Sequence, residues 1–527
     1  MKNRKLIINI GIIVTIISGG IFLVSKGNVS IGTFVTGTQG LPLAQATQTV
    51  ELKNGDTYDL TASFVKKDIN GKEVRMLAYN GSIPGPILKI PQGATIKINF
   101  KNNTDMANTL HSHGVRMENA FDGVIDVTQK AVSVGDSFSY ILKFPDAGAY
   151  WYHPHMRDDY AIEMGLYGNF LVTPAKDSSW NPVDREVPIF VDDILFINGK
   201  IAPFKKEGAD RTLMGRYGNI IFVNGETDYM LNVMKGEVIR FYFTNSANVR
   251  PFNLVIAGAK MKLVGGDSGL YEHDMWIDSV MINPSERAIV EVLFDASGEY
   301  ALQNKTPNIT YTLGKIIVSN EQIVLEIAKS FLVLRAHSEV IKSIGPFRFL
   351  FKKNPDKHIN LSLDMMGSSS MGENMMSDGN MMMGNGAGID RRFQGGGIEW
   401  EDDIFMMNAM SDTKMMSWNI VDRDTGKKNL DIDWKFKVGD KVKIRITNDG
   451  ISAHSMQHPI HFHGQRFLVL NNNGIEQINL VWKDTVTVPA GEYVDILLDA
   501  SNPGTWVAHC HILEHIEAGM VFAFKVE

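Results

Sequence analysis

The chain has 527 residues, a length that the usual ~150 residues per domain divides into three or four domains. Hydrophobic residues make up 44% and charged residues 21% of the sequence, which excludes a wholly disordered or collagen-like protein. The net charge of −7 provides no basic surface for a nucleic-acid backbone, so we expect no nucleic-acid partner. Two counts are unusual: one Cys, which excludes an intrachain disulfide, and 27 Met.

The N-terminus carries an apolar run, Leu6–Val24, after three basic residues. Its length is near the ~20 residues that span a bilayer. Because no small-residue cleavage site ends the run, we favour an uncleaved membrane anchor over residues 1–26, with a cleaved signal peptide as the alternative. Both interpretations place the remaining chain outside the cytoplasm, in the periplasm or at the cell surface, anchored or secreted. Residues 27–48, rich in Gly and Thr, are typical of a tether.

Two β-strand elements recur three times in the same order. The first is a turn glycine, a strand of alternating polar and apolar residues, and an Asn nine positions later. The second runs through an Asp and a Gly into an aromatic strand. Three copies of an all-β unit predict three consecutive β-sandwich domains. The first element spans 93–102, 236–245 and 439–448, and the second spans 144–153, 294–303 and 498–509.

The spacing of the copies predicts the domain boundaries and an insertion. Gly93 and Gly236 are 143 residues apart, whereas Gly236 and Gly439 are 203 residues apart. The additional residues precede the third copy, where Met is concentrated. We therefore predict domains over 49–178, 179–340 and 341–527, with a Met-rich insertion over 364–416 in the third.

Ten of the 14 histidines fall into four short clusters, which is not the pattern of scattered structural histidines. Imidazole is the commonest metal ligand. In a His-x-His pair on a strand both rings point to one face, because side chains alternate with period two. Each pair can therefore offer two nitrogens to one metal site. The clustered residues are His111, His113, His153, His155, His458, His461, His463, His509, His511 and His515.

The clusters stand at equivalent positions in the first and third copies. The middle copy has Phe252–Val255 and Gln303–Lys305 at those positions, so it has no ligands there and we interpret it as a spacer. A metal site built from the first and third copies must lie where these two domains meet.

One cluster contains the single Cys and identifies the metal. Two imidazoles, a thiolate and a weak axial thioether form a blue-copper electron-transfer site, here His458, Cys510, His515 and Met520. Zinc prefers four firm ligands and would not need the Met. The other eight clustered residues are all histidines. A ligand set without a carboxylate suits copper better than non-haem iron. Because Cys510 stands between two histidines, electrons can leave its sulfur along two short covalent paths.

From about Val50 to Glu527 the sequence resembles the three-domain multicopper oxidases, the family of laccases, bilirubin oxidases and copper-tolerance cuprous oxidases. All four copper motifs occur in order. The resemblance implies three cupredoxin-like Greek-key β-sandwich domains and four copper ions. It implies a type 1 copper at His458, Cys510, His515 and Met520; a type 2 copper at His111 and His461; and two type 3 coppers, one at His113, His153 and His511, the other at His155, His463 and His509.

The resemblance also implies the reaction. Family members oxidise a donor one electron at a time at type 1 copper and reduce O2 to two waters at the trinuclear cluster, which consumes four protons. Asp122 and Glu514 resemble the family's proton-donating carboxylates. Their alternative roles are an Asp-Gly turn residue and a solvated loop acid. The axial Met520 implies a lower type 1 potential than Leu or Phe would give.

The Met-rich insertion suggests the substrate. Its methionines lie among Gly, Ser and Asn without apolar partners, which argues against core filler. Thioethers select Cu(I), and the resemblance implies that Met-rich insertions in the third domain mark members that oxidise Cu(I). Met456 lies two residues before a blue-copper ligand and is a further candidate. The Cu(I)-binding candidates are Met365, Met366, Met371, Met375, Met376, Met381, Met382, Met383 and Met456.

The leading hypothesis is a cuprous oxidase of copper tolerance that uses O2 as acceptor. The second hypothesis is a laccase-like phenol or aryl-amine oxidase, or a ferroxidase, in which the insertion is only a lid. The third is a copper-sequestering protein without turnover. The complete ten-histidine pattern argues against the third, because storage needs no trinuclear cluster.

Overall fold

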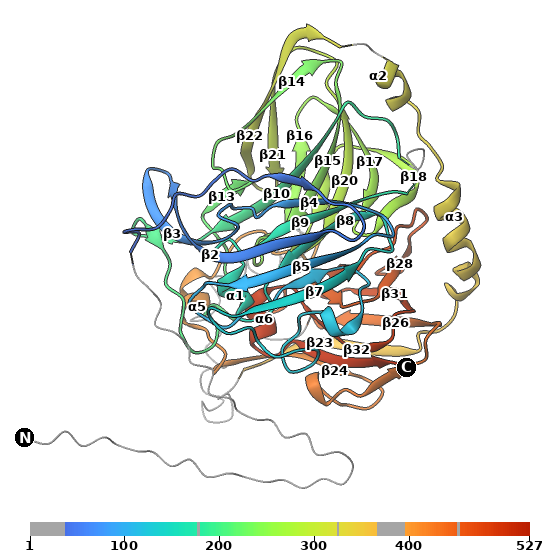
Figure 1. Cartoon of the computed structure of the whole chain (residues 1–527). Helices are drawn as coiled ribbons and strands as arrows, with labels where there is room; N and C mark the ends of the chain where they lie inside the picture. The colour runs from blue at the N-terminus through green and yellow to red at the C-terminus, as the bar shows by residue number, and fades with distance from the viewer. Residues whose placement is uncertain (1–36, 176–179, 324–325, 366–395, 451–453) are drawn as a thin grey trace, which may run out of the picture.

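Within the described residues, the computed structural model is mostly β-structure, arranged as three pairs of sheets along the chain and one additional two-stranded sheet (Figure 1). The all-β class predicted from the sequence is confirmed. We call the three pairs, with their connecting segments, the first, second and third domains. The structure describes residues 37–175, 180–323, 326–365, 396–450 and 454–527, so the predicted anchor over 1–26 lies outside them. Every helix in these ranges is too short or too polar to span a bilayer.

The first domain pairs a four-stranded sheet, ordered β3-β2-β5-β7, with a five-stranded sheet, ordered β1-β4-β9-β8-β6. Strand β5 alternates buried and more exposed residues, as its polar and apolar alternation predicts. The helical segments are η1 (Asn119–Phe121) and α1 (Asp158–Ala161). The strands are β1 (Thr49–Glu51), β2 (Thr57–Ile69), β3 (Lys72–Tyr79), β4 (Ile87–Pro91), β5 (Thr95–Asn102), β6 (His111–His113), β7 (Ser137–Lys143), β8 (Gly148–His153) and β9 (Gly168–Thr173).

The second domain pairs a six-stranded sheet, β13-β10-β15-β20-β17-β18, with a five-stranded sheet, β14-β22-β21-β16-β19. The helical segments α2 (Glu326–Phe331), α3 (Ser338–Ile344) and η3 (Gly345–Leu350) then lead to the third domain. The strands are β10 (Arg185–Ile194), β11 (Phe196–Ile197), β12 (Lys200–Ile201), β13 (Ile220–Val223), β14 (Tyr229–Lys235), β15 (Val238–Asn245), β16 (Phe252–Ile256), β17 (Lys260–Gly266), β18 (Gly269–Ile277), β19 (Val280–Ile282), β20 (Arg287–Leu293), β21 (Gly298–Lys305) and β22 (Thr310–Gln322).

The third domain pairs the sheets β24-β23-β26-β31-β28-β29 and β25-β33-β32-β27-β30. Its helical segments are α5 (Phe405–Met410), η4 (Asn429–Asp431) and α6 (Leu513–Glu517). Met365 and Met416 are opposite each other in the β23–β24 pair, so the insertion begins and ends side by side. The strands are β23 (Lys357–Met365), β24 (Met416–Asp422), β25 (Trp434–Phe436), β26 (Asp440–Asn448), β27 (His458–Phe462), β28 (Arg466–Asn472), β29 (Ile475–Glu476), β30 (Thr485–Val488), β31 (Tyr493–Ala500), β32 (Gly504–Cys510) and β33 (Val521–Val526).

The repeated strand has the same surroundings in all three domains. Strands β5, β15 and β26 each pair parallel with an earlier strand and antiparallel with a later one. The repeated Asn explains why the Gly-to-Asn spacing is the same in the three copies. Its side-chain amide donates to two backbone carbonyls that would otherwise be buried without partners. The acceptors are Met106 and Val132 for Asn102 (2.8 and 2.9 Å), Arg250 and Ile282 for Asn245 (2.8 and 3.0 Å), and Met456 and Val488 for Asn448 (2.7 and 3.0 Å).

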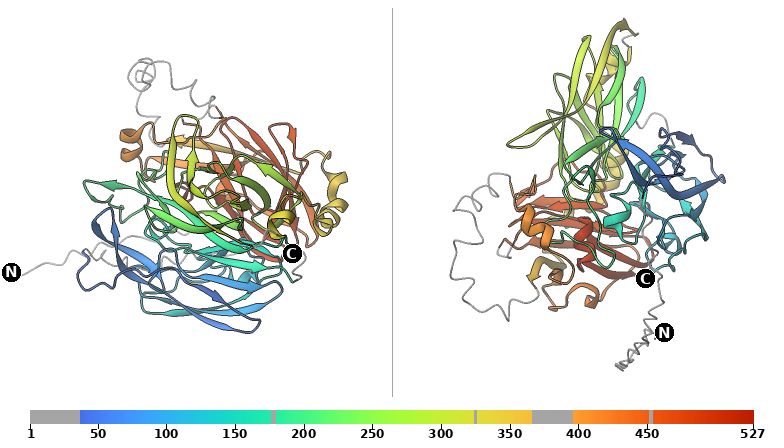
Figure 2. Two further views of the ribbon diagram at one scale, coloured as in Figure 1. Left: turned by 90° about the horizontal axis from the view of Figure 1, so that it is seen from above. Right: turned by 90° about the vertical axis from the view of Figure 1, so that its left-hand side faces the viewer.

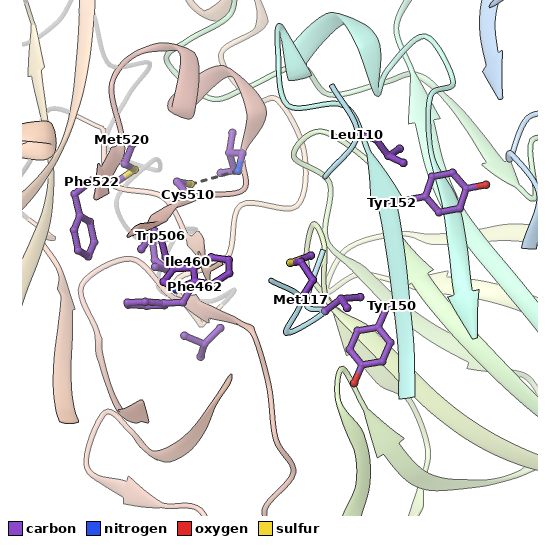
Figure 3. Packing of buried hydrophobic residues seen from close by; sticks show 14 of the residues in the cluster. Leu110, Met117, Tyr150, Tyr152, Ile460, Phe462, Trp506, Cys510, Met520 and Phe522 are labelled. Atoms are coloured by element: carbon purple, nitrogen blue, oxygen red, sulfur yellow. Dashed lines mark hydrogen bonds between the residues drawn. The ribbon is translucent and has the colours of Figure 1, made fainter. Parts of the chain in front are cut away.

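The first and third domains share a continuous hydrophobic core. Leu110 and Tyr152 of the first domain and Ile460 and Trp506 of the third belong to one cluster of buried residues (Figure 3). The second domain has a separate core between its own two sheets. In the right-hand view of Figure 2, the first and third domains lie side by side beneath the second. The junction of the first and third domains therefore lies within this shared core, with the second domain on one side of it.

Candidate metal centre

The local strand geometry brings the histidine clusters together in pairs. His111 and His153 are opposite each other on β6 and β8, and His461 and His509 are opposite each other on β27 and β32. The two domains then meet ring to ring. His111 stacks on His463 with ring centroids 4.0 Å apart, and the rings of His113 and His461 are 3.6 Å apart. Eight histidines thus converge at the junction of the first and third domains.

The converging histidines form overlapping groups whose potential ligand atoms lie within 4.8 Å of one another. One group is the predicted set of His155, His463 and His509. The set of His113, His153 and His511 also converges, with ring centroids 5.1 to 5.7 Å apart. The rings of His111 and His461, the predicted type 2 pair, are 5.9 Å apart. The other groups at the junction are His111, His113 and His153; His111, His461 and His463; and His113, His461 and Asp484.

Hydrogen bonds to backbone carbonyls decide which nitrogen of each histidine ring is available to bind a metal. A carbonyl can only accept, so a ring nitrogen bonded to it carries the proton and the other nitrogen keeps its lone pair. The Nδ1 atoms of His111, His153, His461 and His509 donate to the carbonyls of Asp122, Pro154, Asp484 and Cys510 at 2.6 to 2.8 Å.

Several lone pairs at this centre have no partner. The buried Nε2 atoms of His111, His155, His461 and His511 have no hydrogen-bond partner among the described residues. Buried polar atoms are rarely left unsatisfied. An unpartnered set of converging imidazole nitrogens is what a metal-binding site presents, so these residues fit copper.

Burial keeps these imidazoles neutral. Desolvation, with repulsion from neighbouring histidines, lowers the pKa of His113, His461 and His463 well below the ordinary value. Desolvation also lowers the pKa of His509 to about 4. Neutral rings have lone pairs to offer a cation at neutral pH.

A second group of ligands lies in the third domain. The Cys510 sulfur is 3.5 Å from Nδ1 of His458 and 3.9 Å from Nδ1 of His515, and the two nitrogens are 3.3 Å apart. Helix α6 returns the chain after β32, which places His515 beside Cys510. Met520 lies next to Cys510, with both side chains fully buried (Figure 3). Desolvation raises the pKa of Cys510, so a bound cation is needed to hold the thiolate.

Both predicted carboxylates are buried, and Asp122 contacts the histidine centre directly. Asp122 accepts a hydrogen bond from Nδ1 of His463 through Oδ2 at 3.0 Å. Glu514 accepts one from Asn248 of the second domain through Oε1 at 3.0 Å, while its Oε2 has no partner among the described residues. Desolvation, followed by repulsion from Asp159, raises the pKa of Glu514 to about 8. Neither carboxylate is a solvated surface group.

A third carboxylate, Asp484, was missed at the sequence level. Its Oδ1 accepts a hydrogen bond from Nε2 of His113 at 3.0 Å, so this ring, unlike its neighbours, turns Nδ1 toward the centre. Arg287 on β20 forms a two-pronged ion pair with the same carboxylate. None of the converging histidines comes from the second domain. It is not only a spacer, however, because its Arg287 fixes the carboxylate that bonds to His113. No motif marks Asp484, because its partners are distant in sequence.

The methionine candidates are in different environments. Met456 is 0% exposed and packs in the core shared by the first and third domains, so it is not placed to take an ion from solvent. Met365 is 43% exposed at the end of β23. The remaining candidates, Met366, Met371, Met375, Met376, Met381, Met382 and Met383, lie outside the described residues.

Three family models, each described as multicopper oxidase, match residues 62–177, 173–321 and 403–527. The chain is 25% identical over 484 residues to the multicopper oxidase mco of Staphylococcus aureus, covering 89% of this chain and 88% of that protein. It is 24% identical over 602 residues to copper resistance protein A of Escherichia coli, covering 92% and 94%. A solved laccase from Pediococcus acidilactici is similar in fold, with a TM-score of 0.68, 22% identity and coverage of 94% and 95%.

The fold, the unpartnered histidines and the buried thiol together define a copper-dependent oxidoreductase. The chain belongs to the multicopper oxidase family. Family membership implies copper cofactors, O2 and an electron donor as the reactants.

Proposed function

We propose that this multicopper oxidase is a cuprous oxidase that oxidises Cu(I) outside the cytoplasm as a form of copper tolerance. Four Cu(I) ions each lose one electron, and O2 gains four electrons and four protons to form two waters. Copper held by the group around Cys510 and by the histidines of the domain junction would supply the one-electron redox chemistry that couples the donor to O2. The relative named copper resistance protein A supports this proposal.

We assign the protein ligands from the family motifs. The type 1 copper takes the buried group around Cys510, and the type 2 and type 3 coppers take the eight histidines at the domain junction. The convergence of these ligand atoms supports the assignment. The predicted sets are His458, Cys510, His515 and Met520 for type 1; His111 and His461 for type 2; and His113, His153 and His511, with His155, His463 and His509, for type 3.

The proton donors in this proposal are Asp122 and Glu514. Asp122 touches the ring of His463, so it can hold a proton beside the histidine centre. Glu514 lies under the Gly215 backbone and is held by Asn248, so it can pass a proton from the side of the second domain. Both therefore act from within the protein, where water is excluded.

The observation that carries the choice of Cu(I) is the exposure of thioethers in the insertion of the same domain, together with a closed type 1 site. His458 and His515 are fully buried, so a bulky phenol has no imidazole edge to contact. Helix α5 presents Met406 and Met410, which are 71% and 63% exposed. They lie one helical turn apart, and soft thioethers favour Cu(I) over Fe(II).

A variant of the insertion tests the donor. We expect replacement of the exposed Met406 and Met410 by Leu, together with Met366, Met371, Met375, Met376, Met381, Met382 and Met383, to slow Cu(I) oxidation on the order of 10-fold, because this removes the thioethers proposed to capture the ion. The oxidation of a phenol should not change. The matched control replaces Met76, Met106 and Met261, buried methionines of the first and second domains, by Leu. The rate of Cu(I) oxidation is measured as O2 uptake by the copper-loaded protein.

The alternative hypotheses give different results. Equal rates of Cu(I) oxidation in the variant and the unchanged protein would favour a laccase-like phenol or aryl-amine oxidase, or a ferroxidase. No O2 uptake with any donor, despite full copper loading, would favour a copper-sequestering protein.

The cellular location is a separate proposal. We propose that residues 1–26 hold the enzyme at the outer face of the cytoplasmic membrane. Fractionation of cells that make the full chain should recover it in the membrane fraction, and removal of 1–26 should release it or retain it in the cytoplasm. Recovery of a shortened soluble form from the exterior would instead indicate a cleaved signal peptide.

A further inference from the structure

Both imidazoles of the proposed type 1 site contact the same tryptophan. The ring of Trp418 on β24 stacks on His515, with centroids 4.2 Å apart and planes inclined by 27°. The same ring meets His458 edge to face, with centroids 4.8 Å apart and planes at 69°. Trp418 is fully enclosed. One side chain therefore limits the orientation of two rings at once.

Trp418 is itself fixed on several sides. Its Nε1 donates to the backbone carbonyl of Thr212, in the second domain, at 2.6 Å. Its backbone N–H donates to the carbonyl of Ala518 at 3.1 Å, and its own carbonyl accepts a hydrogen bond from Asn429 at 3.2 Å. A buried indole with its N–H bonded has one orientation, because turning it would leave that donor unpaired.

The segment of the second domain that accepts the hydrogen bond from Trp418 also forms hydrogen bonds with the insertion. Asn408 of α5 donates to the carbonyl of Gly215 at 2.8 Å and accepts from the N–H of Met214 at 3.1 Å. Ser411 accepts from the N–H of Leu213 at 3.0 Å through its hydroxyl, and from the N–H of Arg211 at 3.0 Å through its carbonyl. Residues 211–215 thus join α5 to Trp418.

We propose that Trp418 is a positioning residue for the His458 and His515 rings, and that residues 211–215 connect its placement to helix α5. This inference rests on the proposed function, because it assumes that these two imidazoles bind the type 1 copper. Groups behind metal-binding histidines fix ring orientation and tune the metal's potential. The second domain then acts on the electron-accepting site without providing a ligand.

Two substitutions of Trp418 separate stacking from hydrogen bonding. Trp418→Phe keeps a ring over His515 and loses only the bond to Thr212, whereas Trp418→Leu loses both. We expect Trp418→Leu to change the blue absorbance and copper hyperfine splitting, and to slow anaerobic reduction of the blue band by Cu(I) on the order of 10-fold. Trp418→Phe should shift the potential, spectra and reduction rate in the same direction by a smaller amount, because it keeps the stacked ring and loses only the bond to Thr212.

The matched control is Trp434→Phe. Trp434 is also buried in the third domain and donates its Nε1 to Asp422 at 3.1 Å, but its ring packs on Phe436 and Phe522. This variant loses a similar bond without touching either imidazole. Its type 1 potential, spectra and reduction rate should equal those of the unchanged protein.

The connection to α5 has its own variant. Asn408→Leu removes the two bonds to residues 211–215 and a third to Asp402 within the insertion, and we expect it to shift the potential in the same direction as Trp418→Phe. Asn304→Leu is the control, because Asn304 is equally buried on β21. If Trp418→Leu does not bind copper, Trp418→Phe and Asn408→Leu still decide the question.

The outcomes distinguish this inference from the proposed function. If the unchanged, copper-loaded protein lacks a blue absorbance, the assignment of the type 1 ligands is wrong. If it is blue and oxidises Cu(I), but both Trp418 variants match it in potential, spectrum and reduction rate, the positioning role is wrong. Changes confined to the Trp418 and Asn408 variants support it.

Discussion

Met520 is fixed beside the thiol by the backbone around it. Its N–H donates to the carbonyl of His515 at 3.0 Å, and its carbonyl accepts from the N–H of Cys510 at 3.1 Å. The loop from Cys510 to Met520 therefore closes on itself before any metal binds. A single substitution of this residue tests its proposed role as axial ligand.

We expect Met520→Leu to raise the type 1 potential by at least ~60 mV, a tenfold change in a one-electron equilibrium. The physical reason is that a thioether donates electron density that stabilises the oxidised ion, and Leu does not. A redox titration of the blue band measures the shift. Met76→Leu, another buried methionine, should leave the potential unchanged. An unchanged potential in Met520→Leu would exclude the axial assignment.

Asp192 gives a prediction for the dependence of stability on pH. Desolvation raises its pKa to about 8, and the carboxyl is buried in the second domain. Because the folded state holds this proton more tightly than the unfolded state, the stabilisation is full below pH ~4 and is lost as pH rises toward 8. Asp192→Asn keeps the acceptor for the N–H of Asp193 and cannot ionise.

We therefore expect the melting temperature of Asp192→Asn, relative to the unchanged protein, to increase steadily from pH 5 to pH 8. Differential scanning calorimetry of the copper-free protein measures this difference. The exposed Asp68→Asn serves as the control and should give a constant difference. A constant difference for Asp192→Asn as well would contradict the raised pKa.

At the scale of elements, β20 of the second domain supports the histidine centre through Arg287. Its guanidinium bonds to Asp484, and Asp484 orients His113. Arg287 also donates to the carbonyl of Ala149 on β8, at 2.9 Å. One buried cation thus joins strands from all three domains, since Asp484 precedes β30. The middle domain therefore contacts and supports the centre through Arg287, although none of the converging histidines comes from it.

Arg287→Gln should destabilise the protein by about 3–5 kcal/mol, because it leaves the buried Asp484 carboxylate without its cation. It should also lower the copper content per chain, because His113 loses its fixed orientation. Urea unfolding and metal analysis measure the two effects. Arg185→Gln is the control: Arg185 pairs with Glu237 at 2.8 Å but is partly exposed, so its loss should cost less than ~1 kcal/mol. Equal effects in both variants would exclude the supporting role.

At the scale of the whole molecule, the metal centre is part of a domain interface. Ligands from the first and third domains share the proposed ions, and polar contacts flank them. Arg466 of the third domain pairs with Asp146 of the first at 3.1 Å, and Asn502 donates to the carbonyl of Met117 at 2.7 Å. Copper is therefore expected to contribute to the stability of the assembled domains as well as to catalysis.

We expect removal of copper by a chelator to lower the melting temperature by about 4 °C, which corresponds to ~4 kcal/mol of binding free energy at metal concentrations ~1,000 times Kd. Calorimetry before and after chelation measures the change, and reloading with copper should reverse it. An unchanged melting temperature in fully depleted protein would indicate that the histidines do not join the two domains.

Much of the fold was predictable from local sequence. The Asn that ends each repeated strand satisfies nearby loop carbonyls, so the same spacing recurs wherever the same loop closes. The histidine clusters were equally visible, because His-x-His on a strand fixes two rings on one face. The all-β class and the candidate copper ligands depended on these short-range rules.

What only the tertiary structure decided depends on contacts between distant residues. His113 and Asp484 are 371 residues apart in sequence, and Trp418 and Thr212 are 206 apart. No spacing rule links such residues. Burial is decided in the same way: Met456 lies near the blue site in sequence, but the shared core encloses its thioether.

The lone Cys and the excess of Met illustrate the difference between what the sequence determines and what the tertiary structure decides. Cys510 is identified by its neighbours in sequence, since a thiolate flanked by histidines and followed by His515 and Met520 specifies a copper ligand set by residue type alone. The orientation of those ligands, the cover of Trp418 over them and the exposure of Met406 and Met410 are set by packing among three domains. Residue type determines which atoms can bind a metal, whereas only the folded chain determines which lone pairs are left unpaired and where they point.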